Sequence, residues 1–138
     1  MLMVIGLVGG IVGGCSSSDS PEVKVTLSEW SLTAEPATVD AGKVTFVAKN
    51  VGGEEHEMLV VRGTKAGLPT KADGSLDEKA IDSRILGEIE GVKALTDKSK
   101  DFELKQGTYT LLCNAESTIS GKKVSHYVKG MIDEITVR

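Results

Sequence analysis

The chain has 138 residues, the length of a single domain, which argues against a second, separately folded catalytic domain. Its 20 acidic and 16 basic side chains give a net charge of -4, so it lacks the basic excess expected of a nucleic-acid-binding protein. Hydrophobic residues make up 40% of the chain but aromatic residues only 4%, so the core must consist mainly of Val, Leu and Ile, a composition typical of strands.

The N-terminal segment is apolar and carries no charged side chain before Cys15. The run from Leu2 to Gly13 is too short to span a bilayer comfortably and is typical of the hydrophobic region of a signal peptide. The sequence Val12-Gly13-Gly14-Cys15 resembles the bacterial lipobox, in which the cysteine is lipidated and becomes the new N-terminus. The serine-rich stretch that follows is typical of a flexible tether.

We therefore expect three parts in the chain. Residues 1–14 form a signal segment that ends in the lipobox, and residues 15–21 form the lipidated Cys15 and its tether. Residues 22–138 form the folded domain. This organisation predicts an extracytoplasmic protein that is held at the cell membrane, or at its periplasmic face, by a lipid anchor.

Cys113 is the only cysteine of the folded part, so no disulfide is available to it if Cys15 carries a lipid. A free thiol outside the cytoplasm is prone to oxidation unless it is buried or bound to a metal. A cysteine can also serve as a small buried hydrophobic residue. The residues around Cys113 favour the metal.

Three strands are predicted in the first half of the domain. Glu22 to Leu27 and Lys43 to Lys49 alternate between apolar and polar side chains, which is the pattern of a half-buried strand. A third, more continuous apolar strand runs from Glu57 to Arg62 and starts directly after His56. His56 is thus expected at the beginning of a strand.

Residues 63–99 are the least strand-like part of the chain. Ser75 to Glu78 fits a capping box, and the apolar residues between Leu76 and Ile85 fit one face of a short helix that ends at Gly87.

The last part of the chain predicts three more strands, over Asp101–Lys105, Thr108–Cys113 and Met131–Arg138. In these strands Cys113 and Met131 are in phase with the core residues, so both side chains are expected to point inward. Six or seven short strands with one helical insertion, and no alternation of strands and helices, indicate an all-β antiparallel sandwich.

The residues with metal-binding chemistry lie at the ends of these strands. They are the two histidines of the chain, His56 and His126, together with Cys113 and Met131. A thiolate and two imidazoles in a trigonal plane, with a weak thioether on the axis, suit both Cu(I) and Cu(II). Since neither oxidation state demands a new geometry, an electron moves with little rearrangement of such a site.

On these residues the chain resembles the cupredoxin family of small blue copper proteins, which includes plastocyanin and azurin. The resemblance covers about residues 22–138 and implies a Greek-key β-sandwich with one type 1 copper ion bound by His56, Cys113, His126 and Met131. The segments that carry it are Asn50-Val51-Gly52-Gly53-Glu54-Glu55-His56-Glu57-Met58, Gly107-Thr108-Tyr109-Thr110-Leu111-Leu112-Cys113-Asn114 and His126-Tyr127-Val128-Lys129-Gly130-Met131.

The spacing between Cys113 and His126 departs from the family pattern. Twelve residues, 114–125, separate them, whereas family members usually have only a few. The cost of closing a loop rises slowly with its length, so the insertion is tolerable. His126 is nevertheless the ligand with the least support, and a displaced His126 would let Glu116 or a water approach the metal.

Two residues next to the ligands are expected to orient them through hydrogen bonds, namely Asn114 beside Cys113 and Glu57 beside His56. Met58 is a second candidate for the axial position, although its place in a strand is more typical of the core. In the family, the histidine of the last loop usually lies at the surface within an apolar patch. The resemblance therefore predicts a surface position for His126.

The function that the resemblance implies is the transfer of single electrons between extracytoplasmic redox proteins by a monomer, without enzymatic activity. A copper carrier or storage lipoprotein without redox turnover is an alternative. A small copper enzyme is another, if the long loop leaves a coordination position open.

Overall fold

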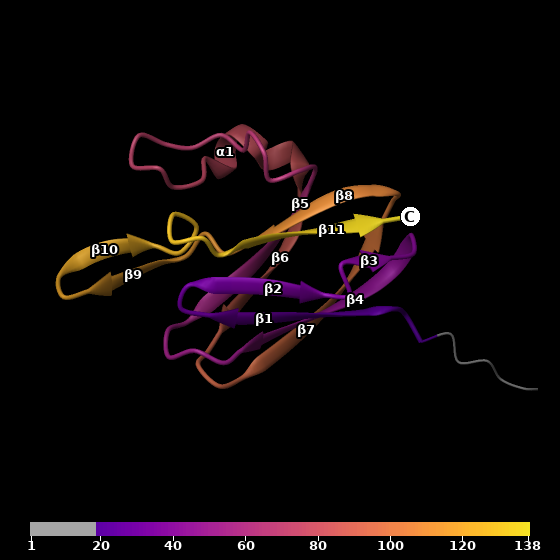
Figure 1. Cartoon of the computed structure of the whole chain (residues 1–138), viewed down its shortest axis with the longest axis horizontal. Coiled ribbons are helices and arrows are strands. Elements are labelled where there is room, and N and C mark those ends of the chain that lie inside the picture. Colours follow the sequence, from indigo (N-terminus) through magenta and orange to yellow (C-terminus); the bar gives the residue numbers. More distant parts are fainter. Residues whose placement is uncertain (1–18) are drawn as a thin grey trace, which may run out of the picture.

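The computed structural model describes residues 19–138, so the predicted signal segment and Cys15 lie outside the described residues. Two β-sheets pack face to face, and a small two-stranded sheet extends from one end (Figure 1). The strands are β1 (Glu22–Ser28), β2 (Ser31–Glu35), β3 (Thr38–Val39), β4 (Gly42–Asn50), β5 (His56–Arg62), β6 (Ile85–Val92), β7 (Asp97–Leu104), β8 (Gly107–Leu112), β9 (Glu116–Ile119), β10 (Lys122–Ser125) and β11 (Ile132–Val137). Within residues 19–138, no helix is long and apolar enough to cross a bilayer.

The first large sheet has the strand order β2-β1-β4-β7 and the second the order β3-β11-β8-β5-β6. Most neighbouring strands are antiparallel, while β1 and β4, and likewise β3 and β11, run parallel. The predicted all-β sandwich is therefore confirmed, with two parallel pairs at the strands where the chain changes sheets.

The core between the sheets follows from the alternation of the strands. In β1, Val23, Val25 and Leu27 are fully buried, while the residues between them face solvent. Phe46 and Phe102 meet edge to face, with ring centroids 5.5 Å apart, a favoured geometry for aromatic pairs. Because nearly all other core residues are aliphatic, the low aromatic content is enough to fill this space.

A second apolar cluster covers the outer face of β5 and β8, which explains why β5 is apolar on both faces. The insertion after β5 supplies this cover, including Leu76 and Ile81. It contains one short helix, α1 (Glu78–Ile81), and a turn of 3-10 helix, η1 (Asp82–Arg84), shown above β5 in Figure 1.

The predicted helix over residues 76–85 is too long, and Ser75, the first residue of the predicted capping box, is not its N-cap. Asp77 is the N-cap, and its Oδ1 accepts a hydrogen bond from Ala80 N at 3.3 Å, whereas Ser75 bonds to Asp73 instead. The helix ends early because Ile85 is the first residue of β6.

Residues 63–99 also hold more strand than the sequence pattern indicates. β6 contains Gly87 and Gly91, both with positive φ, and its pairing with β5 shifts register twice, which hides its alternation. The first five residues of β7 are polar and exposed, because β7 is an edge strand, so they carry no apolar signal.

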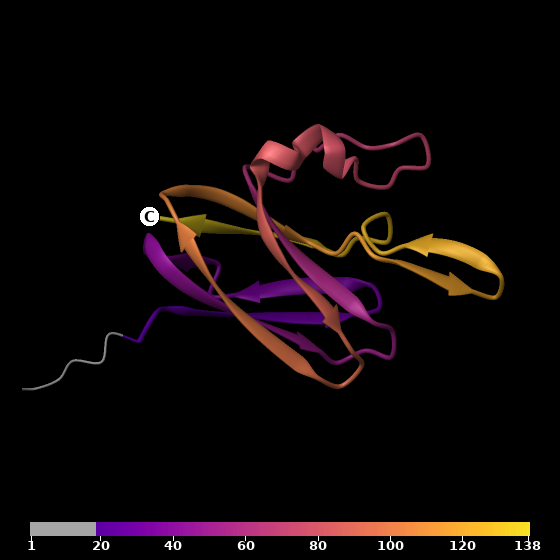
Figure 2. The same ribbon diagram turned by 180° about the vertical axis from the view of Figure 1, so that it is seen from behind.

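The insertion before His126 is an ordered hairpin made of β9 and β10, and it projects from the sandwich in both views (Figures 1 and 2). Its turn is formed by Ser120 and Gly121, with φ angles of 51° and 75°. Two such residues between antiparallel strands match the turn preferred in two-residue hairpins. The residues expected to be a loop are thus a β-hairpin.

Tyr109 in β8 fixes the start of the strand that leads to Cys113. The Tyr109 side chain is fully buried; its hydroxyl donates to Lys105 O at 2.8 Å and accepts from Lys105 N at 3.0 Å.

We expect Tyr109→Phe to lower the free energy of unfolding by about 1–3 kcal/mol, because two part-buried hydrogen bonds to the backbone of Lys105 are lost. Chemical denaturation measures this change. The control is Tyr127→Phe at a half-buried tyrosine, which should be close to neutral, and equal effects of the two changes would contradict this role for Tyr109.

Candidate metal centre

The turn between β4 and β5 holds His56 at one end of the sandwich. Asn50 is buried; its Nδ2 donates to Glu54 O at 2.7 Å and to Val92 O at 2.9 Å, and its Oδ1 accepts from Gly52 N at 2.9 Å. One side chain thus satisfies two backbone groups of the turn and one of β6. His56 follows as the first residue of β5, as the sequence predicts.

Backbone hydrogen bonds tie the other three predicted ligands together. Cys113 N donates to Met131 O at 3.0 Å, and Met131 N donates to His126 O at 3.2 Å. His126 N in turn donates to Ala115 O at 3.0 Å, which closes the base of the β9–β10 hairpin. The long insertion therefore leaves and returns at neighbouring points, and His126 lies beside Cys113 despite the twelve residues between them.

Three donor side chains converge in a fully buried space. The ligand atoms of His56, Cys113 and His126 all lie within 4.8 Å of one another. The two Nδ1 atoms are 3.0 Å apart, and Cys113 Sγ lies 3.4 Å from Nδ1 of His126 and 3.9 Å from Nδ1 of His56. One small ion between these atoms would be within reach of all three donors.

The outer nitrogen of each imidazole has a partner of its own. Nε2 of His56 lies 2.9 Å from Oε1 of Glu29, and Nε2 of His126 lies 2.7 Å from Oγ of Ser117. A carboxylate only accepts hydrogen bonds, so Nε2 of His56 carries the proton and its Nδ1 presents a lone pair to the centre.

Glu29 lies in the two-residue turn between β1 and β2 and is itself firmly held. Its Oε2 accepts from Gly53 N at 3.0 Å and its Oε1 from Glu54 N at 2.9 Å. These backbone hydrogen bonds, followed by that from His56, lower the pKa of Glu29 to about 2. The side chain is thus an anion throughout the neutral range.

The thiol of Cys113 is fully buried, and burial raises its pKa to about 11. The backbone N–H groups of Glu57 and Ala115 oppose this shift, the first by donating to Sγ at 3.4 Å. The site therefore disfavours a free thiolate, while its N–H donors are already directed at the sulfur. A bound cation would supply the missing stabilisation of the thiolate.

His126 is also fully buried, so the predicted surface position is wrong. The hairpin places Ser117 at its Nε2, and the indole of Trp30 packs on its ring with a centroid distance of 4.9 Å. Burial lowers the pKa of His126, and the neighbouring His56 lowers it further. A neutral imidazole is the form that binds a metal.

Met131 is fully buried in the same core cluster as Cys113, so its predicted inward direction is confirmed. Its backbone carbonyl accepts a hydrogen bond from Cys113 N, which holds the two residues side by side. Met58 is fully buried in the same cluster, within β5, which fits a packing role.

The two residues expected to orient the ligands behave differently from one another. Glu57 contacts Cys113 through its backbone N–H, whereas its half-buried carboxylate has a pKa raised to about 7 by burial and then by Glu78. Asn114 donates from Nδ2 to Oε1 of Glu78 at 2.6 Å.

Sequence reasoning missed Glu29, Trp30 and Ser117 as neighbours of the histidines. Glu29 and Trp30 lie in a turn remote from every motif, and Ser117 lies in the insertion. A single sequence contains no signal that would have joined them to the site.

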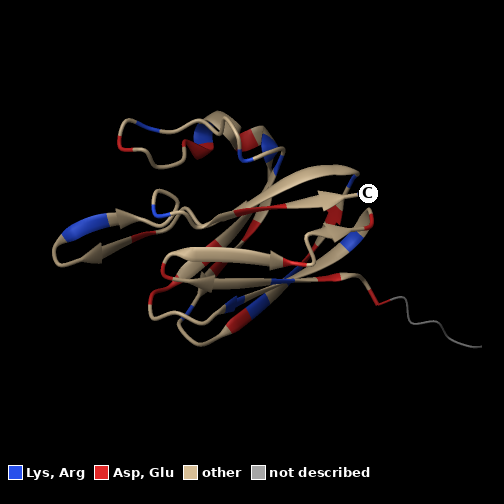
Figure 3. Cartoon of the chain, in the orientation of Figure 1, with Lys and Arg blue, Asp and Glu red and all other residues tan. Residues whose placement is uncertain are grey.

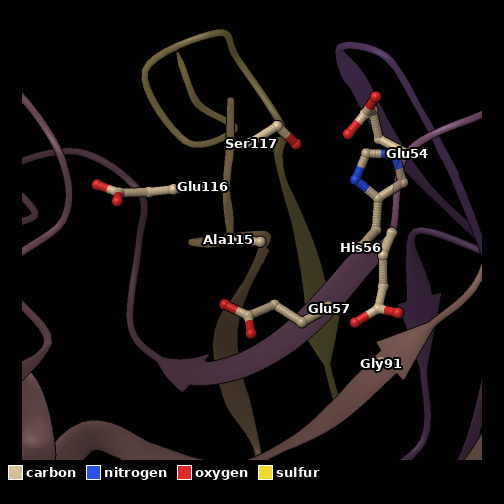
Figure 4. Close-up of a pocket in the computed structure, with 8 residues that line it drawn as sticks. Glu54, His56, Glu57, Gly91, Ala115, Glu116 and Ser117 are labelled. Atoms are coloured by element: carbon tan, nitrogen blue, oxygen red, sulfur yellow. The ribbon is translucent and has the colours of Figure 1, made fainter. Parts of the chain in front are cut away.

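A shallow acidic pocket lies beside His56 (Figure 4). The side chains of Glu57 and Glu116 extend away from the imidazole of His56 in this view. Glu116 is bound to Lys123 across the hairpin, with Nζ 2.9 Å from Oε2, so it does not occupy the place of a ligand.

Charges of opposite sign flank the site (Figure 3). Acidic residues gather at the β1–β2 and β4–β5 turns, including Glu29, Glu54 and Glu55, whereas exposed lysines, Lys122 and Lys123, lie on β10.

The donor set itself indicates which metal fits. One thiolate and two imidazoles form the trigonal set that suits copper, and a buried methionine follows in the same loop. The outer-nitrogen partners and the N–H donors at sulfur are the supporting contacts that such a site needs.

No family model matches the sequence, and no curated protein does. Solved structures do match the fold. Auracyanin from Roseiflexus castenholzii superimposes with a TM-score of 0.57 at 22% identity, over 86% of this chain and 98% of its own. Auracyanin A, described as a "blue" copper protein from Chloroflexus aurantiacus, gives a TM-score of 0.56 at 21% identity, over 87% of this chain and 100% of the auracyanin chain. Rusticyanin from Thiobacillus ferrooxidans gives a TM-score of 0.57 at 16% identity, over 88% of this chain and 79% of the rusticyanin chain.

This chain has the cupredoxin fold. At these identities the likeness extends to the fold, and the expected cupredoxin architecture is confirmed. The cupredoxin sandwich here differs from the expected pattern in one respect, because the residues before His126 form a separate hairpin.

Proposed function

We propose that this protein is a mononuclear type 1 copper protein that transfers single electrons. The observation that carries the proposal is the buried convergence of His56, Cys113 and His126, whose ligand atoms lie within 4.8 Å of one another. Met131 is proposed as the weak axial ligand. The cupredoxin fold of the chain, shared with the copper protein auracyanin A, supports the proposal.

A bound copper ion would supply the one-electron couple between Cu(I) and Cu(II). The protein's own residues limit what changes during transfer. The donors are buried, which shields them from bulk water, and the backbone hydrogen bonds of Cys113, His126 and Met131 hold their spacing. Little reorganisation is needed when the charge at the centre changes.

We propose that electrons pass through Trp30. Because His126 has no exposed edge, direct contact between this imidazole and a partner is blocked. The Trp30 ring lies 4.9 Å from the His126 ring, centroid to centroid, and is only partly buried. It is the aromatic group that connects the buried histidine with the surface.

The burial of the site disfavours the two alternative functions. A copper carrier has to give up its ion readily, whereas here all three converging donors are fully buried. A copper enzyme needs an open position for substrate, and Glu116, the side chain considered for such a site, is bound to Lys123.

We propose redox proteins outside the cytoplasm as partners, and a lipid on Cys15 as the anchor. This part rests on the sequence pattern before Cys15. The mass of the N-terminal peptide of membrane-extracted protein would test it, since an unacylated Cys15 contradicts the anchor.

We expect the purified protein loaded with Cu(II) to show intense thiolate-to-copper absorption in the visible range that bleaches reversibly on reduction. Cys113→Ser should abolish this absorption, because it removes the thiolate. A colourless wild-type protein, or a coloured Cys113→Ser variant, would contradict the proposed site.

The two buried methionines allow a matched test of the axial ligand. We expect Met131→Leu to raise the reduction potential, since loss of the thioether weakens binding of Cu(II), whereas Met58→Leu should leave the potential unchanged. Both changes keep the volume of a buried side chain, so their effects on packing are comparable. If the reduction potential instead changes in Met58→Leu and stays the same in Met131→Leu, then Met58 is the axial ligand and Met131 is a packing residue.

We expect Trp30→Leu to slow electron self-exchange severalfold, measured by NMR line broadening on mixtures of the oxidised and reduced protein. The matched control is Tyr127→Leu, because Tyr127 follows His126 in sequence but packs in the outer apolar cluster. Equal rates in wild type and Trp30→Leu would exclude the proposed route.

A further inference from the structure

The turn that joins β1 and β2 contacts both histidines of the site. Its two residues, Glu29 and Trp30, reach His56 and His126 respectively. Trp30 makes a packing contact, whereas Glu29 makes a hydrogen bond through a carboxylate that carries a full negative charge. The contact of Glu29 is therefore able to affect the electronic properties of a ligand as well as its position.

The structure around Glu29 is built to hold its carboxylate against His56. Two backbone N–H groups of the β4–β5 turn, those of Gly53 and Glu54, donate to its two oxygens. Gly52 is required for this approach, because a Cβ at Gly52 would overlap the carboxylate of Glu29. The register of β1 and β4, in which Leu27 pairs with Asn50, brings the two turns together.

We infer that Glu29 is a positioning residue of the proposed copper site, which holds the His56 imidazole with Nδ1 toward Cys113 and lowers the reduction potential. This inference rests on the proposed function. It assigns a role to a residue outside the ligand motifs.

The physical reason has two parts. Acceptance of the Nε2 proton by a carboxylate fixes the tautomer of His56 and makes the imidazole a stronger donor. The fixed negative charge also lies one imidazole away from the metal position, where it favours the more positive Cu(II) over Cu(I). Both effects act in the same direction, toward a lower potential.

The test compares Glu29→Gln with Glu55→Gln. Glu55 is an exposed carboxylate of the acidic pocket beside His56, and its change removes the same charge without a hydrogen bond to His56. We expect Glu29→Gln to shift the equilibrium toward Cu(I) about tenfold, which corresponds to a rise in potential of about 59 mV for one electron. Glu55→Gln should give a much smaller shift.

Gly52→Ala provides a second variant that keeps Glu29 in the chain. Its Cβ would push the carboxylate away from His56, so the potential should rise as in Glu29→Gln. Thermal unfolding of each variant establishes that it is folded, and Gly52→Ala carries the test if Glu29→Gln is not.

A readout without metal separates this inference from the proposed function. In the metal-free protein, nitrogen chemical shifts of His56 should show the proton on Nε2 in wild type and a mixture of tautomers in Gly52→Ala. Potentials that are equal in wild type, Glu29→Gln and Gly52→Ala would overturn the inference, as would equal shifts in Glu29→Gln and Glu55→Gln. Failure of the wild type to bind copper would overturn the proposed function, and the tautomer measurement would still test the contact.

Discussion

The hydrogen bond from Cys113 N to Met131 O is the contact on which the rest of the site depends, together with those that link Met131 to His126 and His126 to Ala115. They turn the end of β8, the base of a hairpin and the start of β11 into one closed unit. Buried backbone groups that lose their partners are costly, so this unit resists distortion. The positions of three candidate ligands follow from its closure, and the length of the insertion does not affect them.

The centre balances opposing electrostatic demands. Burial excludes water and raises the pKa of the Cys113 thiol, which disfavours an anion, while two backbone N–H groups are directed at its sulfur. On the opposite side the anionic Glu29 bonds to His56 and is stabilised by backbone N–H groups of a turn. A metal cation in the middle of this arrangement would stabilise the thiolate and would interact favourably with the charge of Glu29.

The sequence predicted the parts of this protein that are encoded locally. The alternation in β1 and β4 and the short motifs around His56, Cys113 and Met131 were enough to predict a sandwich with its donors at strand ends. β7 was predicted too short, because its first residues are polar on both faces. The hairpin of β9 and β10 was missed because its strands lack alternation of apolar and polar side chains. Glu29 reaches His56 only through the pairing of β1 with β4, and Ser117 reaches His126 only through the hairpin, so no local sequence pattern indicates either contact.

The hairpin of β9 and β10 contacts the site at its base and projects beyond the sandwich. Ser120 and Gly121 at its tip are separated from Ser117, which contacts His126, by two residue pairs, Lys122–Ile119 and Lys123–Thr118. Substitutions or insertions at this tip would change its length and chemistry and leave the donor atoms in place. The fold thus separates the outer surface of the hairpin from the donor atoms at its base.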